Sequence, residues 1–161
     1  TVAGPAIATF TSAQSLSAYD SNARPMALSF RRLALAALVE SAGKVIVDPS
    51  SRDILIPRSA TSALAQGDHW LPAWKDQELR ELLVLQAQDE CSSITDLNVE
   101  YAGMGVCRVS LVIDPQGVEE ADRAQLREKV LHTIGVLNSN KRLRAVADDI
   151  QWVPRWGTTA G

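Results

Sequence analysis

The sequence predicts an α+β fold in which a sheet and a layer of helices form a two-layer sandwich. Apolar side chains recur every three or four positions over residues 76–91, which is the period of an amphipathic helix. Residues 97–102 alternate apolar and polar, and residues 106–113 are almost continuously apolar and β-branched, as in strands. A second helical pattern and a short apolar run follow. We therefore expect an α-β-β-α-β unit over about 76–153, which has the ferredoxin-like element order without its first strand.

Each element of this unit has a local signal. Asp76 can cap the first helix, and Leu79, Leu82, Leu83 and Ala87 form its predicted inner stripe. The 106–113 strand follows a Gly-Met-Gly turn and is expected in mid-sheet.

The second helix is expected over 119–137, with an inner stripe formed by Leu126, Val130, Ile134 and Leu137. A short helical turn at 141–147 and a last strand at 150–153 complete the unit. Pro154 is expected to end that strand.

A helix and a β-hairpin are predicted upstream, over about 25–56. Pro25 suits the start of a helix and Gly43 suits its end. Residues 44–48 and 52–56 are two short apolar runs, and the residues between them suit a turn.

These elements divide the chain into three parts. Residues 1–24 are rich in Ser, Ala and Thr and lack a sustained period, so we expect an N-terminal arm that is partly disordered or bound to a partner. Residues 25–153 are expected to form a single α+β domain, with a long connection at 57–75. Residues 154–161 are then a C-terminal tail.

The composition is that of an ordinary soluble globular protein. In 161 residues, 46% are hydrophobic, 22% are charged and the net charge is −3, which gives no general attraction to nucleic acid. No apolar run approaches the ~20 residues that span a bilayer. The compartment is not fixed by the sequence, and an organellar or extracytoplasmic location stays open.

The two cysteines, Cys91 and Cys107, allow two interpretations. They could form a disulfide, which would indicate an oxidising compartment, or they could be two small buried apolar side chains. Their spacing does not suit a CxxC redox pair or a zinc site.

No motif in the sequence carries a specific chemistry. His69 and His132 are the only histidines, and neither has a neighbour in sequence that suits it as a general base. Nucleophile-elbow, dinucleotide and phosphate-loop motifs are missing from the sequence. We therefore predict no catalytic residue, no cofactor and no metal, and the sequence leans away from an enzyme.

The leading hypothesis is a non-catalytic protein-interaction or assembly domain, an accessory subunit or scaffold part of a larger complex. Its partner would be another protein or further copies of the chain. Aromatic side chains in or beside irregular segments are the candidate partner-binding residues, since such anchors are enriched at interfaces. They are Phe10, Trp70, Trp74, Trp152 and Trp156. Trp70 and Trp74 could instead fold back over the core as a lid.

The alternative hypothesis is a small enzyme or ligand-binding domain. Its pocket would lie under the 67–74 loop, with Asp68 and His69 as its polar residues and Arg108 holding an anion. A thermal-shift ligand screen on the protein and on His69→Ala separates the two hypotheses.

Overall fold

The structure is a computed structural model that describes residues 5–157. The chain divides into two compact units, Thr1–Trp70 and Leu71–Gly161, which we call the N-terminal unit and the C-terminal unit. The sequence predicted a single domain over 25–153 instead. Each unit has its own three-stranded sheet and its own helices, so each is described by itself.

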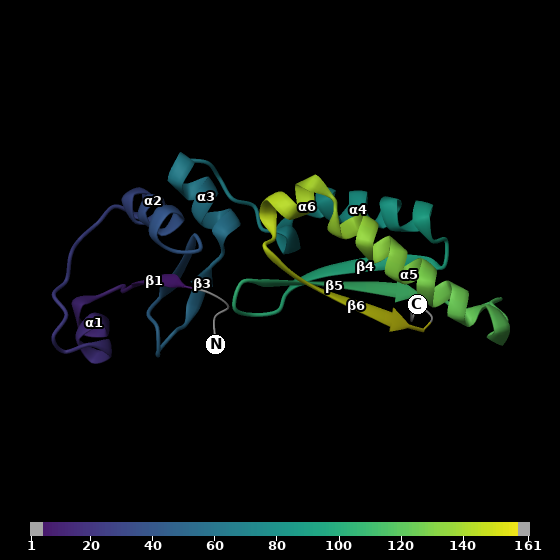
Figure 1. Cartoon of the computed structure of the whole chain (residues 1–161), viewed down its shortest axis with the longest axis horizontal. Helices are drawn as coiled ribbons and strands as arrows, with labels where there is room; N and C mark the ends of the chain where they lie inside the picture. Colours follow the sequence, from purple (N-terminus) through teal and green to yellow (C-terminus); the bar gives the residue numbers. More distant parts are fainter. Residues whose placement is uncertain (1–4, 158–161) are drawn as a thin grey trace. The chain divides into compact units, whose positions relative to one another are not determined.

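The C-terminal unit has the predicted α-β-β-α-β order in two layers (Figure 1). Its helices lie on one face of a sheet with strand order β4-β5-β6. β4 pairs antiparallel with β5, and β6 pairs parallel with β5. The elements are η1 (Ala73–Lys75), α4 (Gln77–Glu90), β4 (Ile94–Tyr101), β5 (Val106–Ile113), η2 (Glu120–Asp122), α5 (Arg123–Asn138), α6 (Lys141–Val146) and β6 (Asp149–Trp156).

The core of this unit is built on β5, as the sequence predicted. Val109, Leu111 and Ile113 are fully buried in the strand, and Leu83 of α4 and Leu137 of α5 are fully buried in the helix layer. Burial of a large aliphatic side chain stabilises a fold by ~1.5–3 kcal/mol, so this strand and the two helices hold most of the stability of the unit.

The predicted stripe of α4 is right at three of its four positions. Leu79, Leu83 and Ala87 are buried, but Leu82 is 44% exposed. A helix that rests on one sheet buries a narrow face, and Leu82 lies beyond the edge of that face. The predicted cap is confirmed, because Asp76 accepts the backbone N–H of Leu79 at 3.0 Å.

β6 continues through Pro154 to Trp156, so the prediction that Pro154 ends the strand is wrong. The N–H of Gly157 donates to the carbonyl of Ile113 at 3.0 Å. In a parallel pair of strands, every second residue has its backbone N–H and C=O directed at the neighbouring strand. Gly157 and Arg155 are therefore directed at β5, and the backbone of Pro154 between them is directed at the outer edge of the sheet. A missing N–H costs the sheet nothing there, and it interrupts the row of donors that another strand would use.

The N-terminal unit is a smaller α+β body, and it includes part of the predicted arm. Its sheet order is β1-β2-β3, with β1 parallel to β2 and β2 antiparallel to β3. The elements are β1 (Ala6–Thr9), α1 (Ala13–Tyr19), α2 (Phe30–Glu40), β2 (Lys44–Val47), β3 (Ile54–Ile56) and α3 (Arg58–Gln66).

Two expectations in this unit change. α2 begins at Phe30 rather than at Pro25, because the hydroxyl of Ser29 accepts the N–H of Arg32 and caps the helix there. Residues 58–66, expected to be part of a long connection, form α3, which ends at Gly67 with φ +83°. That left-handed conformation is the usual place for glycine after a helix.

Candidate protein-interaction surface

α2 and α3 pack against each other and lie side by side (Figure 1). The buried residues of both helices are small: Ala34 and Ala37 in α2, and Ala60, Thr61 and Ala65 in α3. Small residues allow the helices to approach closely, but each of them removes little apolar area from water. The helices of this unit therefore bury little apolar area.

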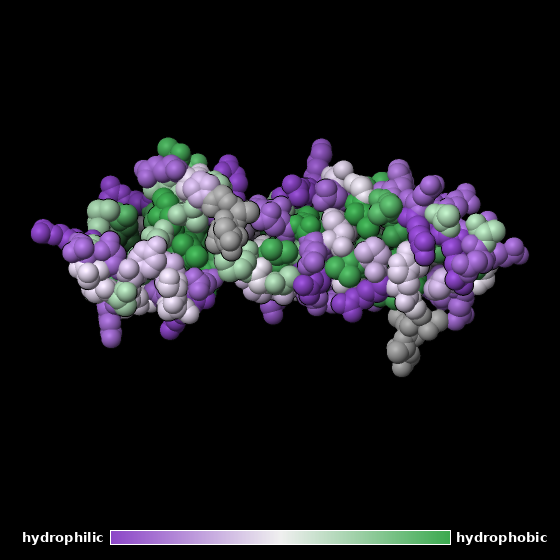
Figure 2. All heavy atoms as spheres, turned by 60° about the horizontal axis from the view of Figure 1, so that its bottom comes forward, coloured by the Kyte–Doolittle hydropathy of each residue, from purple (hydrophilic) through white to green (hydrophobic). Residues whose placement is uncertain are grey.

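Many large apolar side chains of the N-terminal unit are exposed, and few are buried. Among its described residues, Val45 and Leu55 are the buried apolar residues larger than alanine. The exposed large apolar residues are Tyr19, Met26, Leu28, Phe30, Leu35, Val39, Ile54 and Leu64. Figure 2 shows hydrophobic side chains reaching the surface of this unit. An apolar patch marks an interaction site, and Met26, Leu28, Leu35 and Val39 are the members of this set that belong to α2 or to the segment before it.

The segment that leads into α2 contributes to this surface. Residues 23–29 form neither helix nor strand, and Met26 and Leu28 within them are exposed. Between this segment, β1 and α1 lies a hollow of about 490 Å³. Its apolar lining includes Ile7, Phe10 and Leu16. A partner could therefore place apolar side chains in a recess as well as on a flat face.

The charge around these apolar side chains is basic. Arg24, Arg31 and Arg32 lie in the same stretch, and Asp20 is the only acid between Thr1 and Val39. Arg31 is held in place, because its Nε donates to the carbonyl of Ala65 at 3.1 Å. Arg24 and Arg32 are exposed. The surface thus combines apolar contact area with positive charge at its rim.

Asp48 fixes the strand beside the hollow. Its Oδ1 accepts the N–H of Thr11 at 2.9 Å, and its Oδ2 accepts the Thr11 hydroxyl at 2.6 Å. These hydrogen bonds lower the pKa of the Asp48 carboxyl, with a smaller contribution from Arg52. The buried carboxylate therefore ties the chain after β1 to the turn after β2.

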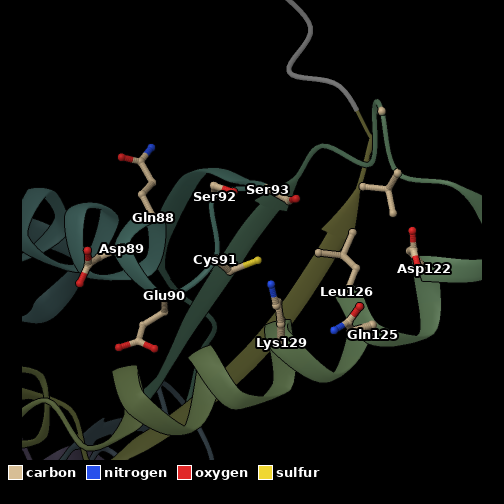
Figure 3. A pocket seen from close by; sticks show the side chains of 12 residues that line it. Gln88, Asp89, Glu90, Cys91, Ser92, Ser93, Asp122, Gln125, Leu126 and Lys129 are labelled. Atoms are coloured by element: carbon tan, nitrogen blue, oxygen red, sulfur yellow. The ribbon is translucent and has the colours of Figure 1, made fainter.

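A separate hollow of about 460 Å³ lies in the C-terminal unit (Figure 3). It is lined by the end of α4 with the turn that follows, by Gly117 and Val118 after β5, and by Asp122 with the first turns of α5. Cys91 and Lys129 point into it, while Glu90 turns away toward His132, whose Nε2 is 3.7 Å from a Glu90 oxygen. We assign no reaction to this hollow. Its residues are spread over three segments, so sequence reasoning missed it.

The sequence-predicted aromatic candidates lie in different environments. Trp74 packs on the C-terminal core with its ring 4.9 Å from that of Tyr101, and Trp152 packs on the same core. The packing of Trp74 agrees with the lid interpretation. Phe10 lies 5.4 Å from Tyr19 in the N-terminal unit.

The remaining two tryptophans are less enclosed. Trp70 is half-buried at the end of the N-terminal unit. Trp156 is 46% exposed at the end of β6, beside Arg123 and Arg127. Whether any of the aromatic candidates contacts a partner stays a prediction, and Trp156 has the most exposed surface to do so.

The residues of the alternative pocket are not brought together within one unit. Asp68 and His69 are exposed and belong to the N-terminal unit. Arg108 belongs to the C-terminal unit, where it bonds Glu100 at 3.2 Å and Gln151 at 3.0 Å. Arg108 is therefore part of a polar row across the sheet.

Both cysteines are buried free thiols, in agreement with the interpretation of Cys91 and Cys107 as small apolar side chains. Burial raises the pKa of the Cys107 thiol to about 11, which makes the reactive thiolate scarce. Within residues 5–157, no three His, Cys, Asp or Glu side chains gather as metal ligands would. In the same range, no helix has the length and apolar character needed to cross a membrane.

One comparison with known proteins gives a match. Residues 3–63 are similar to the family described as SseB protein N-terminal domain. The match runs from β1 into α3, so it covers the N-terminal unit and ends before the C-terminal unit begins. No curated protein and no solved structure matches the chain. The similarity supports treating the N-terminal unit as a domain of its own.

Proposed function

We propose that this chain is a non-catalytic protein-interaction or assembly domain, an accessory or scaffold part of a larger complex. The observation that carries the proposal is the distribution of apolar side chains among the described residues of the N-terminal unit, where eight large ones are exposed and the buried apolar residues are Val45, Leu55 and four alanines. Exposing such side chains to water costs free energy, and a partner that covers them recovers it.

The interaction surface is the outer side of α2 together with the segment before it. Leu35 is 49% exposed and Val39 is 85% exposed, although the same helix also buries Ala34 and Ala37. Apart from Arg31, Arg32 and Glu40 near its two ends, α2 is apolar throughout, and an apolar helix is normally buried. The outer face of α2 therefore has the composition of an interface.

Co-purification tests the proposal directly. Full-length tagged protein is compared with Leu35→Asp/Val39→Asp in native extract, and the bound proteins are quantified. The matched control is Leu131→Asp, because Leu131 is an exposed leucine on α5. We expect the α2 variant to lose a bound protein that the control retains, while both keep the helical circular dichroism of the unchanged chain.

Two results would count against the proposal. One is a set of bound proteins that is the same for the unchanged chain and both variants. The other is unfolding of the α2 variant, which would mean that Leu35 and Val39 stabilise the unit itself.

A further inference from the structure

The outer face of α2 has an ordered pattern of charge. Arg32, Leu35 and Val39 are spaced by three and four residues, so they form one stripe along the helix. The stripe begins at a basic residue, continues through two exposed apolar residues and ends beside Glu40. Arg32 and Glu40 are exposed, and neither forms an ion pair with another described residue.

This pattern is complementary to itself when two copies run in opposite directions. If the two-fold axis passes near Ala36, Arg32 of each copy lies opposite Glu40 of the other. The two residues are eight positions apart, about 12 Å along the helix, so the pair forms once at each end of the contact. Ala36 of both copies then lies between the two ion pairs, and Leu35 and Val39 of both copies line one side of the contact. Antiparallel helices also place opposite dipole ends together.

We propose that the chain forms a two-fold symmetric dimer in which α2 packs antiparallel against α2 of a second copy. The dimer rests on the proposed function, because it names the partner of the same α2 surface. A two-fold contact uses one patch twice, so a patch that is basic at one end and acidic at the other suits a second copy. An acidic helix of another protein would match Arg32 but would meet Glu40 with like charge.

The contact buries a small area, so we expect the dimer to be weak. Two turns of helix cover less than the ~800 Å² per partner of a standard interface. Met26, Leu28 and Phe30 extend the apolar area beyond the Arg32 end of the stripe. We therefore expect concentration-dependent association rather than a permanent dimer.

Charge reversal gives a sharp test by sedimentation equilibrium of the full chain. In Arg32→Glu, two carboxylates face each other at each end of the contact, and in Glu40→Arg two guanidinium groups do. Each variant alone should dimerise at least about tenfold more weakly than the unchanged chain, since like charges face each other twice. An equimolar mixture of the two variants brings opposite charges together again, so heterodimers should form. The double variant Arg32→Glu/Glu40→Arg should dimerise like the unchanged chain.

The control is Arg127→Glu, an exposed arginine on α5 that is not part of the proposed contact and should leave dimerisation unchanged. The dimer is overturned if the chain stays monomeric at every concentration, if the single variants dimerise normally, or if their mixture stays monomeric. The proposed function fails separately: a monomeric chain that loses a bound protein through Leu35→Asp/Val39→Asp would reject the dimer and keep the interaction surface.

Discussion

Removing the carboxylate of Asp76 should lower the free energy of unfolding of the C-terminal unit, because a helix cap and an ion pair are lost together. Asp76 is 7% exposed, and its Oδ1 accepts the N–H of Leu79 at 3.0 Å, which caps α4. The same carboxylate accepts Nη2 of Arg142 at 2.9 Å on each oxygen, which joins α4 to α6. In Asp76→Ala both interactions are lost.

The cap sets the lower limit of the effect. Replacing an N-cap Asp by Ala costs ~1 kcal/mol, which corresponds to about 4–8 °C in Tm for a unit of this size. The ion pair adds to that loss, because Arg142 is left beside the positive end of α4 without its buried partner. Asp76→Asn keeps a good capping side chain and removes the charge, so it should lie between the unchanged chain and Asp76→Ala.

Urea denaturation followed by circular dichroism measures both parts. The difference between the Asn and Ala variants reports the cap, and the difference between the unchanged chain and the Asn variant reports the ion pair. Repeating the Asn substitution in Arg142→Ala should remove most of the second difference. The reasoning is refuted if Asp76→Ala unfolds at the same urea concentration as the unchanged chain.

Three further outcomes are expected. Leu111→Ala, at a fully buried site in β5, should lower the free energy of unfolding measured in urea by ~2–5 kcal/mol. Leu131→Ala, at a site that is 65% exposed, should change it by less than ~0.5 kcal/mol. Similar losses in the two variants would contradict the assigned core. Because the pKa of the Cys107 thiol is raised in the folded chain, the unfolded chain loses this proton at lower pH, and the free energy of unfolding should fall as pH rises from 9.0 toward about 11. In Cys107→Ala the free energy of unfolding should fall less over the same range. Parallel pH profiles of the two proteins would contradict this. Because the pKa of Asp48 is lowered in the folded chain, its carboxylate stabilises the fold above pH 3.8, and this stabilisation is lost as the pH falls below that value. Asp48→Asn should therefore make the free energy of unfolding less dependent on pH in acid. An unchanged slope would argue against the Thr11 hydrogen bonds.

Elements with large apolar residues at regular spacing were predictable from the sequence. β5 has the predicted bounds, 106–113, because its continuous apolar run has no other stable position than mid-sheet. α4 was predictable from its period and from Asp76 at its start. These signals are local, so a single stretch of sequence contains them.

The elements that were missed have weak local signals. α3 buries Ala60, Thr61 and Ala65, which are too small to give a clear apolar period. β1 has four residues and is stabilised by pairing with β2, which lies more than thirty residues later in the sequence. Because that pairing is non-local, no pattern within residues 6–9 predicts it.

The candidate surface was only partly predictable from the sequence. The spacing of Leu33, Ala34, Ala37 and Leu38 places them on one side of α2, so the inner side of this helix was predictable from the sequence. The exposure of Leu35 and Val39 on the other side is seen only in the structure. Aromatic residues in irregular segments were the stronger signal in the sequence, and two of them, Trp74 and Trp152, pack on the core.

Photo-crosslinking from position 39 tests most directly whether the N-terminal unit presents an interaction surface. A photoactivatable amino acid replaces Val39 in the full chain, and a second protein carries it at Leu131, the exposed control site on α5. Irradiation in native extract should give a discrete product of higher mass from position 39 and none from position 131, since only the first site lies on the proposed interface. Equal crosslinking from both positions, or no product from position 39, would contradict the account.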